Sequence, residues 1–497
     1  MAVEGFTMSP PYGGLDLVSP IDNMEPIYAL ELINITPTAS APEVRKGYTL
    51  NATITGGAPV NTLRALPLQS GVTRLVAMSG ASIWDIAAGV ATNVTGTTSL
   101  TSSNCSTEIF SNRMFICNGV DTVQVYNGAT TVDSTFTGVT LSTLVTVSSY
   151  KKRLYFVKKN TFQLWYGATS AVGGSALTLE ELETIFSKGG YLLFAGSYTN
   201  QTAQTSADLF FACSSEGEII FYSGSDPTDW GLVARFYIGK PLGYNSFMRI
   251  NQDVWILTQQ GIVPVSALFQ ADPQQALLSV SGKINPLISQ AANLFPFSYR
   301  WHGVFFPAGN KVLIQVPTSE TSTTMLVWDM DTKGWTRYVL DDLGNAISMA
   351  MADKSLYYSG STGKVFNADT GQNDNGNPIN FTLRSAFSFY GARGNFKAFK
   401  DCRPLLKTQR GQSFVLGLDT DFKKLPNTDT ITSTPGTTTA WGAPWGSPWS
   451  GGSEYVFDRF AVRGQGHSAA IKFIGSVKDS PLQILGFEVR FDIGGQV

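Results

Sequence analysis

The sequence predicts an all-β protein organised around an irregular β-propeller of six or seven blades. Two observations lead to this prediction: a recurring unit of paired β-prone runs, and turn residues at the ends of those runs. The unit recurs from Arg74 to Asp369, and its copies start 38 to 59 residues apart. A period of about 40 residues is expected of one four-stranded propeller blade. Because a single blade is too thin to bury both faces, blades must stack into a ring.

Each copy is an apolar run, a short polar or glycine turn, a second run ending in an aromatic residue, and another turn. The copies are RLVAMSGASIWDIAAG from Arg74, NRMFICNGVDTVQVYNGAT from Asn112, KRLYFVKKNTFQLWYGAT from Lys152, DLFFACSSEGEIIFYSGSDPTDW from Asp208, QDVWILTQQGIVPVSAL from Gln252, KVLIQVPTSETSTTMLVWDMDTKGW from Lys311 and KSLYYSGSTGKVFNAD from Lys354. These copies define a propeller over residues 49–370.

The length of the chain leaves room for two further segments beside the propeller. At 497 residues the chain exceeds the ~250–300 residues at which one core stops growing.

Charged residues make up 14% of the chain, against the ~25% usual for soluble domains, which fits strands whose outer faces meet other subunits. The net charge is −2 and no basic run stands out, so gripping nucleic acid is not expected as the main activity. Passage of DNA through a weakly charged channel remains compatible with this balance.

Residues 1–48 are expected to form an extended arm that lies along the body of the protein or along a neighbour. Prolines and glycines punctuate this segment and exclude a long helix. Apolar residues such as Leu15, Ile27 and Leu32 give the arm a surface that can dock, although a floppy tail is the alternative. The start of the chain has no basic region followed by an apolar one, so no secretory signal is expected. No apolar stretch approaches the ~18 residues of a membrane span.

Two interruptions of the blade rhythm predict helical insertions near residues 175–190 and 270–295. In the first, Thr178 and Glu181 have the spacing of a capping box, and Gly189 with Gly190 would end the helix. The second contains a helical piece at about Asn285 to Leu294. Such insertions either contact partners on one rim or give local support.

Two turns place an aspartate four residues before a tryptophan, at Asp226 to Trp230 and Asp331 to Trp335. An aspartate can bond to the downstream amides of its own turn, and a tryptophan ring can be buried between adjacent blades. The turn resembles the aspartate box of sialidase-type propellers, in which the spacing is longer by one residue. A structural turn is therefore favoured over a sugar-binding site.

Residues 371–497 are predicted to form a C-terminal β-sandwich-like domain of six to eight strands. The turn-rich sequence GQNDNGNP marks its boundary with the propeller, and alternating apolar and charged residues follow. Within it, the Trp-rich loop 426–452 carries Trp441, Trp445 and Trp449 between glycines and prolines. These rings are candidate partner contacts, since tryptophan is enriched in subunit interfaces. A loop folded onto its own domain, or stacking on sugars, bases or a membrane surface, are the alternatives.

No catalytic, metal or cofactor site is predicted. His302 and His467 lie near no nucleophile motif, and the four cysteines show no C-x-x-C spacing, which makes a zinc site and a disulfide framework improbable. Cys117 and Cys213 lie inside apolar runs, where a free thiol acts as a small hydrophobe, and synthesis in a reducing cytoplasm is expected. Carboxylates such as Asp329 and Asp331 keep a glycosidase pair open, because the two members can come from distant blades.

The stretch from Gly13 to Tyr48 resembles the opening of structural proteins from tailed-phage virions. A Gly-Gly-Leu start is followed by a proline, an Ala-x-Glu-Leu-x-Asn segment, and an Arg-x-Gly-Tyr motif at Arg45, Gly47 and Tyr48. The order of arm, irregular propeller and β-rich C-terminal part is also similar to the hub or nozzle proteins of short phage tails, including the packaged-DNA stabilisation proteins. The resemblance implies a ring of six subunits around the DNA exit channel, in the tail of a virion assembled in the host cytoplasm.

The resemblance implies a structural protein without enzymatic activity. Its homo-oligomeric hexamer would line the channel, retain packaged DNA until DNA ejection, and let DNA pass without sequence-specific binding. Partners would be the head–tail adaptor or portal-side proteins above and tail fibres or spikes below. The rival prediction, from a different class, is a virion-associated glycan-binding or glycan-hydrolysing β-propeller.

Overall fold

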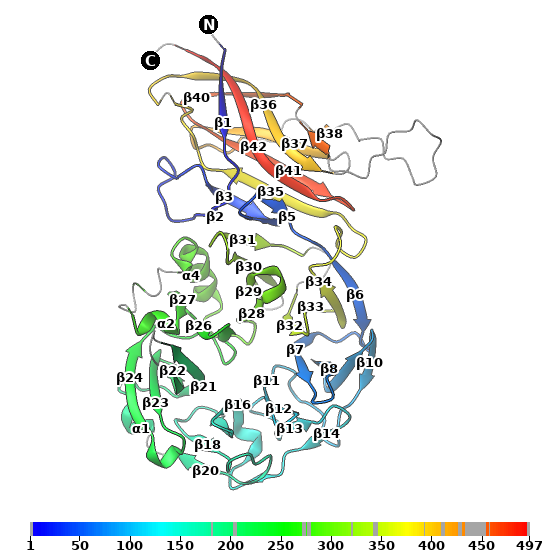
Figure 1. Ribbon diagram of the computed structural model, residues 1–497, viewed down its shortest axis with the longest axis vertical. Helices are drawn as coiled ribbons and strands as arrows, with labels where there is room; N and C mark the ends of the chain where they lie inside the picture. The colour runs from blue at the N-terminus through cyan, green and yellow to red at the C-terminus, as the bar shows by residue number, and fades with distance from the viewer. Residues whose placement is uncertain are drawn as a thin grey trace. The chain divides into compact units, whose positions relative to one another are not determined.

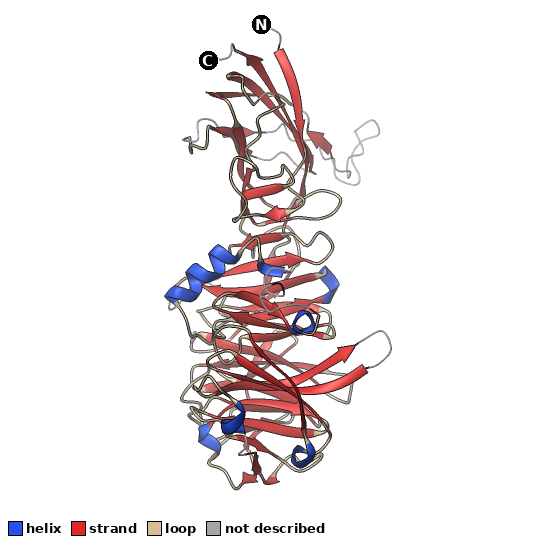
Figure 2. Ribbon diagram, turned by 90° about the vertical axis from the view of Figure 1, so that its left-hand side faces the viewer, coloured by secondary structure: helices blue, strands red, loops and turns tan. Residues whose placement is uncertain are grey.

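The computed structural model describes residues 3–179, 182–201, 206–270, 275, 280–319, 322–340, 346–391, 393–408, 413–425, 430–432, 454–456 and 458–494. Strands make up most of the chain and helices are few (Figure 2). The chain divides into two compact units. Met1–Thr49, Leu326–Val339 and Asp369–Val497 form the first, here called the sandwich unit, and Leu50–Met325 and Leu340–Ala368 form the second, the propeller unit.

The propeller unit consists of sheets arranged around a common axis, as the sequence predicts, and Figure 1 shows them around its centre. The first four sheets each have four antiparallel strands, numbered outward from the axis. Their strands are β7 (Val60–Pro67), β8 (Thr73–Ser79), β9 (Ser82–Ala87) and β10 (Val90–Asn93); β11 (Ser106–Phe110), β12 (Arg113–Cys117), β13 (Gln124–Tyr126) and β14 (Thr131–Asp133); β16 (Leu144–Tyr150), β17 (Arg153–Lys158), β18 (Leu164–Tyr166) and β20 (Leu177–Leu179); and β21 (Leu192–Gln201), β22 (Ser206–Ser214), β23 (Glu218–Ser223) and β24 (Gly231–Tyr237).

The remaining three sheets are less regular, and the last one closes the ring. It takes its outermost strand, β6, from the N-terminal side of the propeller, so the first and last parts of this unit are joined by hydrogen bonds. The strands are β25 (Phe247–Ile250), β26 (Asp253–Thr258) and β27 (Gly261–Pro264); β28 (His302–Phe306) and β29 (Lys311–Pro317), followed by β30 (Thr323–Asp329), whose first residues lie in this unit; and β32 (Ser348–Ala352), β33 (Ser355–Ser359), β34 (Lys364–Ala368) and β6 (Tyr48–Thr53).

Short elements lie in the connections between and within these sheets. They are the parallel pair β15 (Phe136–Thr137) and β19 (Gly174–Ser175), the helices α1 (Leu182–Ile185), α2 (Val265–Leu268) and α4 (Asn285–Leu294), and the 3-10 turns η1 (Leu141–Thr143), η2 (Pro227–Asp229) and η3 (Pro307–Gly309). Helix α4 has the bounds that the sequence predicts. A helix is present near 175–190, as the sequence predicts, but it is the single turn α1. The predicted start at Thr178 is wrong, because Thr178 lies in β20 and pairs with Trp165. Residues Leu177–Leu179 form a strand instead of a helix start because their pairing with β18 completes the third sheet.

The apolar core of the propeller unit lies between adjacent sheets. One buried cluster joins Met78 of β8 and Ile83 of β9 to Met114 and Ile116 of β12, all at or below 2% exposure. A second joins the last sheet to the first, through residues such as Val365 and Leu63. Each sheet therefore buries its two faces against its neighbours, which is why the copies seen in the sequence cannot fold singly.

The sandwich unit is made of two sheets that pack face to face. One has the order β39-β36-β42-β5-β4, with β1 also paired to β42 and β40 to β36; the other runs β31-β2-β3-β35-β41-β37-β38. Their strands are β1 (Val3–Met8), β2 (Gly14–Leu15), β3 (Tyr28–Ile33), β4 (Ile35–Thr36), β5 (Glu43–Val44), β31 (Trp335–Tyr338), β35 (Ile379–Ser385), β36 (Lys397–Thr408), β37 (Ser413–Thr420), β38 (Thr430–Thr432), β39 (Glu454–Val456), β40 (Phe460–Gly466), β41 (Ala469–Val477) and β42 (Leu482–Ile493).

Aromatic side chains fill the space between these two sheets. The ring of Phe473 in β41 lies 5.9 Å from that of Phe487 in β42, and the ring of Phe414 in β37 lies 5.6 Å from that of Phe460 in β40. Burial alternates along β36 and β42, as it does in strands with one buried and one wet face.

The N-terminal segment expected as an extended arm lies along its own chain. Strand β1 pairs with β42 from Val3 opposite Asp492 to Met8 opposite Phe487, and β3 lies between β31 and β35. The five strands β1–β5 are therefore integral to the sandwich unit. They join its sheets because their apolar side chains alternate with polar ones. This pattern favours strands with one buried face over an unpaired tail.

Candidate functional site

The predicted partner contacts Trp441, Trp445 and Trp449, with the whole loop 426–452 except Thr430–Thr432, lie outside the described residues. Their role as an inter-subunit anchor stays a prediction.

The first of the two Asp–Trp turns is built as the sequence predicts. The Asp226 carboxylate accepts hydrogen bonds from the Thr228 amide at 3.2 Å and from the Arg153 guanidinium at 2.7 Å. The Trp230 ring then stacks on Tyr155 of the third sheet at 5.5 Å and on Tyr222 of the fourth at 5.4 Å. The turn thus fixes the packing of two adjacent blades, which is a structural role.

The second turn belongs to the sandwich unit, and Asp329, two residues before the predicted aspartate, accepts hydrogen bonds in it. The donors are the amides of Asp331 at 3.2 Å and Thr332 at 2.9 Å. Trp335 is buried at 1% exposure, with its ring 6.3 Å from that of Trp328. Asp329, one of the carboxylates considered for glycan hydrolysis, therefore has a conformational role in this turn.

The four cysteines are free thiols, and all of them are buried. Burial raises the pKa of the Cys213 thiol, and the same cause dominates for Cys105, Cys117 and Cys402. Because the thiolate is the reactive species, these side chains act as small hydrophobes, as the sequence predicts for Cys117 and Cys213. Within the described part of the chain, no three His, Cys, Asp or Glu side chains are close enough to hold a metal ion.

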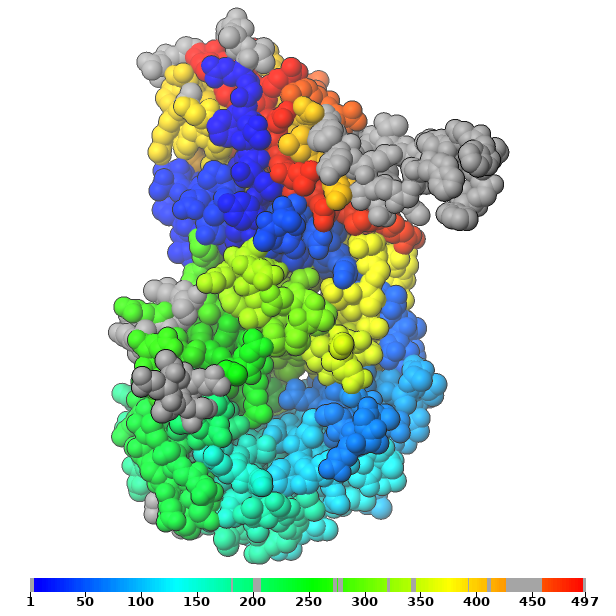
Figure 3. Space-filling model, in the orientation of Figure 1, coloured from blue at the N-terminus to red at the C-terminus, as the bar shows by residue number. Residues whose placement is uncertain are grey.

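The axis of the propeller unit contains a cavity of about 670 Å³. Its lining comes from the innermost strands β7, β11, β16, β25, β28 and β32 and from turns next to them, all within the propeller unit. Figure 3 shows the hollow in the middle of this face of the unit. The volume falls within the ~300–1,000 Å³ that is typical of small-molecule sites.

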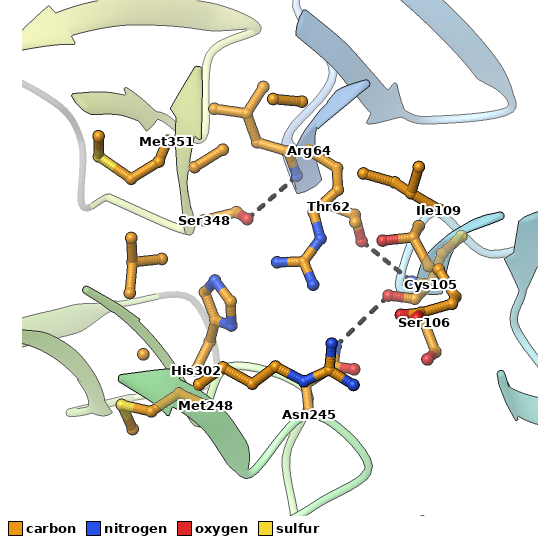
Figure 4. A pocket seen from close by; sticks show the side chains of 18 of the residues that line it. Thr62, Arg64, Cys105, Ser106, Ile109, Asn245, Met248, His302, Ser348 and Met351 are labelled. Carbon is orange, nitrogen blue, oxygen red and sulfur yellow. Dashed lines mark hydrogen bonds between the residues drawn. The ribbon is translucent and has the colours of Figure 1, made fainter. Parts of the chain in front are cut away.

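Charged and polar side chains from different strands meet in this axial cavity. Its charged residues and its histidine are Arg64 of β7, Glu108 of β11, Arg249 of β25, His302 of β28 and Asp353 after β32. In Figure 4 Arg64, Thr62, Asn245 and His302 surround one space, although they lie up to 240 residues apart in the chain (302 minus 62).

Arg64 is the dominant cation of the cavity. Among the described residues no carboxylate oxygen lies within 4.0 Å of its guanidinium, and its side chain is open to the cavity. Restricted hydration lowers the pKa of Arg64, Glu108 opposes this effect, and the positive charge of Arg249 adds to it. Arg249 donates a hydrogen bond to the Ser197 hydroxyl at 3.1 Å.

The two carboxylates of the cavity are each bonded to a hydroxyl group. Ser149 donates to Glu108 at 2.5 Å, and Thr73 donates to Asp353 at 2.5 Å. Each carboxylate is therefore oriented by a neighbouring strand or turn. The arrangement leaves Arg64 as the charged group without a direct partner among the described residues.

His302 is neutral in this environment. Burial and the nearby positive charge of Arg64 lower its pKa to about 4, although a hydrogen bond with the Met349 carbonyl, at 3.1 Å, favours the protonated form. Since a carbonyl oxygen only accepts, Nε2 carries the proton in the neutral ring, and Nδ1 is the acceptor nitrogen. Above pH 5 the ring therefore adds a hydrogen-bond acceptor, not a charge, to the cavity.

This pKa makes the protein sensitive to acid. His302 titrates near 6.5 in the unfolded chain and near 4 in the folded one, so the unfolded chain binds the proton first as the pH falls. The stability present above pH 6.5 is therefore lost progressively down to pH 4, by about 2 kcal/mol at pH 5. Urea unfolding at pH 7.5 and pH 5 should show a smaller loss for His302→Gln than for the parent protein. Equal losses would contradict this role.

A second constellation lies in the sandwich unit, at the motif that carries the phage-tail resemblance. Arg45 is buried at 3% exposure and forms a bidentate ion pair with Asp374, with N–O distances of 2.8 and 2.6 Å. Its other bonds go to the Asn34 side chain and to the carbonyls of Lys46 and Val339. All five N–H donors of the guanidinium are thus used.

Gly47 and Tyr48 complete this constellation. A Cβ atom on Gly47 would lie 1.7 Å from the carbonyl oxygen of Asn373, so no other residue fits at this close approach of two chain segments. Tyr48 is fully buried, and its amide donates to the same carbonyl at 3.2 Å. The Arg-x-Gly-Tyr motif therefore binds the end of the arm to the segment GQNDNGNP. From the sequence alone this segment is expected to be a linker.

The charged residues of the axial cavity were not singled out by sequence analysis. The copies found in the sequence begin at the second strand of each sheet, as Arg74 in β8 and Asp208 in β22 show. The innermost strands were missed because polar residues interrupt their apolar pattern. The sequence does hold one indication of these residues. Glu108 lies four positions before the copy that starts at Asn112, and Arg249 lies three positions before the copy that starts at Gln252.

No protein-family model matches the chain, and no curated protein matches it. Several solved structures resemble it at low similarity. The extracellular domain of a hybrid two-component system protein from B. thetaiotaomicron is 11% identical, covers 65% of this chain and has a TM-score of 0.43. The chain spans 41% of the length of that structure.

Two further structures show similar values. YCF48 bound to a D1 peptide is 11% identical and covers 63% of this chain and 93% of its own, with a TM-score of 0.39. The designed protein Ika8 is 12% identical and covers 64% of this chain and 99% of its own, with a TM-score of 0.37. Among the described residues, no helix has the length and apolar character needed to cross a membrane. The chain is an all-β protein with an irregular β-propeller and a β-sandwich-like part formed by its N- and C-terminal segments.

Proposed function

We propose that this chain is a structural protein of a tailed-phage virion, one subunit of a tail hub or nozzle ring around the DNA exit channel. In this role it retains packaged DNA, lets it pass during ejection, and connects the head–tail adaptor to distal tail parts or fibres. The proposal assigns it a mechanical role and a ring of six copies, as the resemblance implies.

The Arg45 constellation is the observation that carries this proposal. The residues of the resemblance, Arg45, Gly47 and Tyr48, form one connected feature with strict requirements: five bonds to one guanidinium, and a position at which only glycine fits. A motif with such requirements is a better basis for a family resemblance than an extended segment without contacts. It supports the proposal that the arm-to-body connection of those tail proteins is present here.

The weak charge of the chain also supports a channel-wall role. With a net charge of −2 and 14% charged residues, such a wall would let phosphates slide past instead of binding them. A closed ring of identical subunits needs a heterologous contact whose rotation closes, which gives cyclic symmetry.

Negative-stain images and mass photometry of the purified protein test this proposal. We expect closed rings with a central hole, and six copies in the largest species. A protein that stays monomeric or trimeric and releases reducing sugar ends from a bacterial polysaccharide would instead identify the glycan-hydrolysing propeller. In that case, neutralising one carboxylate should abolish the release, and Glu108→Gln would be the first variant to examine because Glu108 faces the axial cavity.

A further inference from the structure

We propose that the axial cavity of the propeller unit is a binding site for a small organic anion, one that carries a carboxylate or phosphate group and neighbouring hydroxyl groups. The site lies within a single propeller unit, to which every residue that lines it belongs. Its volume of about 670 Å³ suits a ligand of the size of a sugar acid or a sugar phosphate.

Arg64 provides the recognition group for the anion. Its guanidinium is accessible from the cavity and has no carboxylate within 4.0 Å among the described residues. Arg64 is an exposed residue, so a ligand in the cavity can reach its guanidinium. A planar carboxylate or a phosphate can take two parallel hydrogen bonds from a guanidinium.

Neighbouring groups favour an anion over a cation at this position. Arg249 contributes a second positive charge that is close enough to act on Arg64. The Glu108 carboxylate also acts on Arg64, but it already accepts a hydrogen bond from Ser149. Glu108 is therefore placed to accept further hydrogen bonds from ligand hydroxyl groups, and it would repel a second anionic group of the ligand.

The hydroxyl-binding part of the site comes from uncharged side chains. Ser106 and Ser149 line the cavity, and the neutral His302 presents Nδ1 as an acceptor once Nε2 has donated to the Met349 carbonyl. Phe247 and Phe305 supply apolar surface in the same lining. One strong cationic anchor with several neutral partners is the composition of a selective small-molecule site.

A purely structural role for Arg64 makes a different prediction for stability. If Arg64 were held in place for its attraction to Glu108, replacing it by methionine would lower the melting temperature. As an exposed ligand-binding group it contributes little to the fold, so Arg64→Met should leave the melting temperature of the unliganded protein within about 1 °C. This measurement needs no ligand and separates the two roles.

Binding is tested by calorimetry and thermal shift on the full chain with glucuronate, glucose 6-phosphate, inorganic phosphate and neutral glucose. We expect at least one of the two organic anions to bind, glucose to bind at least about tenfold more weakly, and Arg64→Met to weaken anion binding at least about tenfold. Arg64→Lys, which keeps the charge but loses the planar fork, should bind with intermediate affinity. Comparing glucuronate with glucose 6-phosphate tells a carboxylate from a phosphate ligand.

The control is Arg113→Met, at an exposed arginine that begins β12 and does not line the cavity. It should leave both binding and melting temperature unchanged. The proposal is overturned if neither organic anion binds at 10 mM, about the weakest affinity such a site would need. It is also overturned if glucose binds as well as the anions, or if Arg64→Met and Arg113→Met bind the anions equally well. Binding of phosphate alone would also contradict it, because that ligand has no hydroxyl-bearing part.

Discussion

Replacing Arg45 by methionine is expected to lower the free energy of unfolding of the sandwich unit by about 3–5 kcal/mol, because it leaves the Asp374 carboxylate buried without its ion partner. Arg45 is 3% exposed and Asp374 is 5% exposed, so water cannot replace the lost bonds. The measurement is urea unfolding followed by hydrogen exchange of peptides from each unit. Exchange should accelerate in the sandwich unit, at β3 and β35, while the propeller unit keeps its protection.

Two further variants define the cause of this loss. Lys46→Met removes the next basic residue, which is half exposed and lies 3.7 Å from Asp369, and should cost less than about 1 kcal/mol. Adding Asp374→Leu to Arg45→Met removes the unpaired charge and should restore part of the stability. If the double variant were less stable than Arg45→Met alone, the unpaired charge would not be the source of the loss.

Deletion of residues 1–40 is expected to unfold the sandwich unit. The deletion removes β1, which pairs with β42 over six residues, and β3, which lies between β31 and β35. It also removes buried apolar side chains, among them Met8, Leu15, Leu32 and Ile35. At about 1.5–3 kcal/mol for each, their loss approaches the 5–15 kcal/mol that stabilises a whole domain.

Differential scanning calorimetry and limited proteolysis measure this effect. The full chain should protect both units, whereas the truncated chain should keep a protease-resistant propeller unit and lose residues 369–497. A matched deletion of residues 1–2, which ends before β1, should behave like the full chain. A truncated chain with a protease-resistant sandwich unit would contradict the structural role of the arm.

Assembly of the ring is better tested by substitution than by deletion of the arm. A deletion would confound the loss of a contact between subunits with unfolding of the sandwich unit. Substitution of exposed residues of the arm, such as Val18 and Ile21, leaves the strands intact and tests contact with a neighbouring subunit directly. Replacing both by serine should leave the melting temperature within about 1 °C, and should prevent ring closure only if the arm reaches a neighbour.

The sequence was most informative where local pattern is enough. Strands β8 and β12, helix α4 and the Asp226 turn follow from apolar runs, turn residues and short-range hydrogen bonds, all of which lie within about a dozen residues. The helix start expected at Thr178 is wrong, although helix α1 follows it. Its capping pattern is local, but pairing of β20 with β18 is a tertiary interaction that outweighs it.

The axial cavity could not have been assembled from the sequence. Arg64, Glu108, Arg249 and His302 belong to four different sheets, and each is the only charged residue or histidine of its own strand. Their proximity depends on how many sheets close the ring and on which side chains point to the axis. Neither quantity is visible in a pattern of apolar runs.

By itself the sequence determined the class of the protein: thin sheets in series, which must stack because none can bury both faces, followed by a second β-rich part. Only the tertiary structure decided which distant segments meet. Arg45 and Asp374 are 329 residues apart, and Asn34 bonds to Val339 across 305 residues. The reason is physical: strand formation depends on neighbouring side chains, whereas the choice of strand partners and buried charge pairs depends on the closed arrangement of the whole chain.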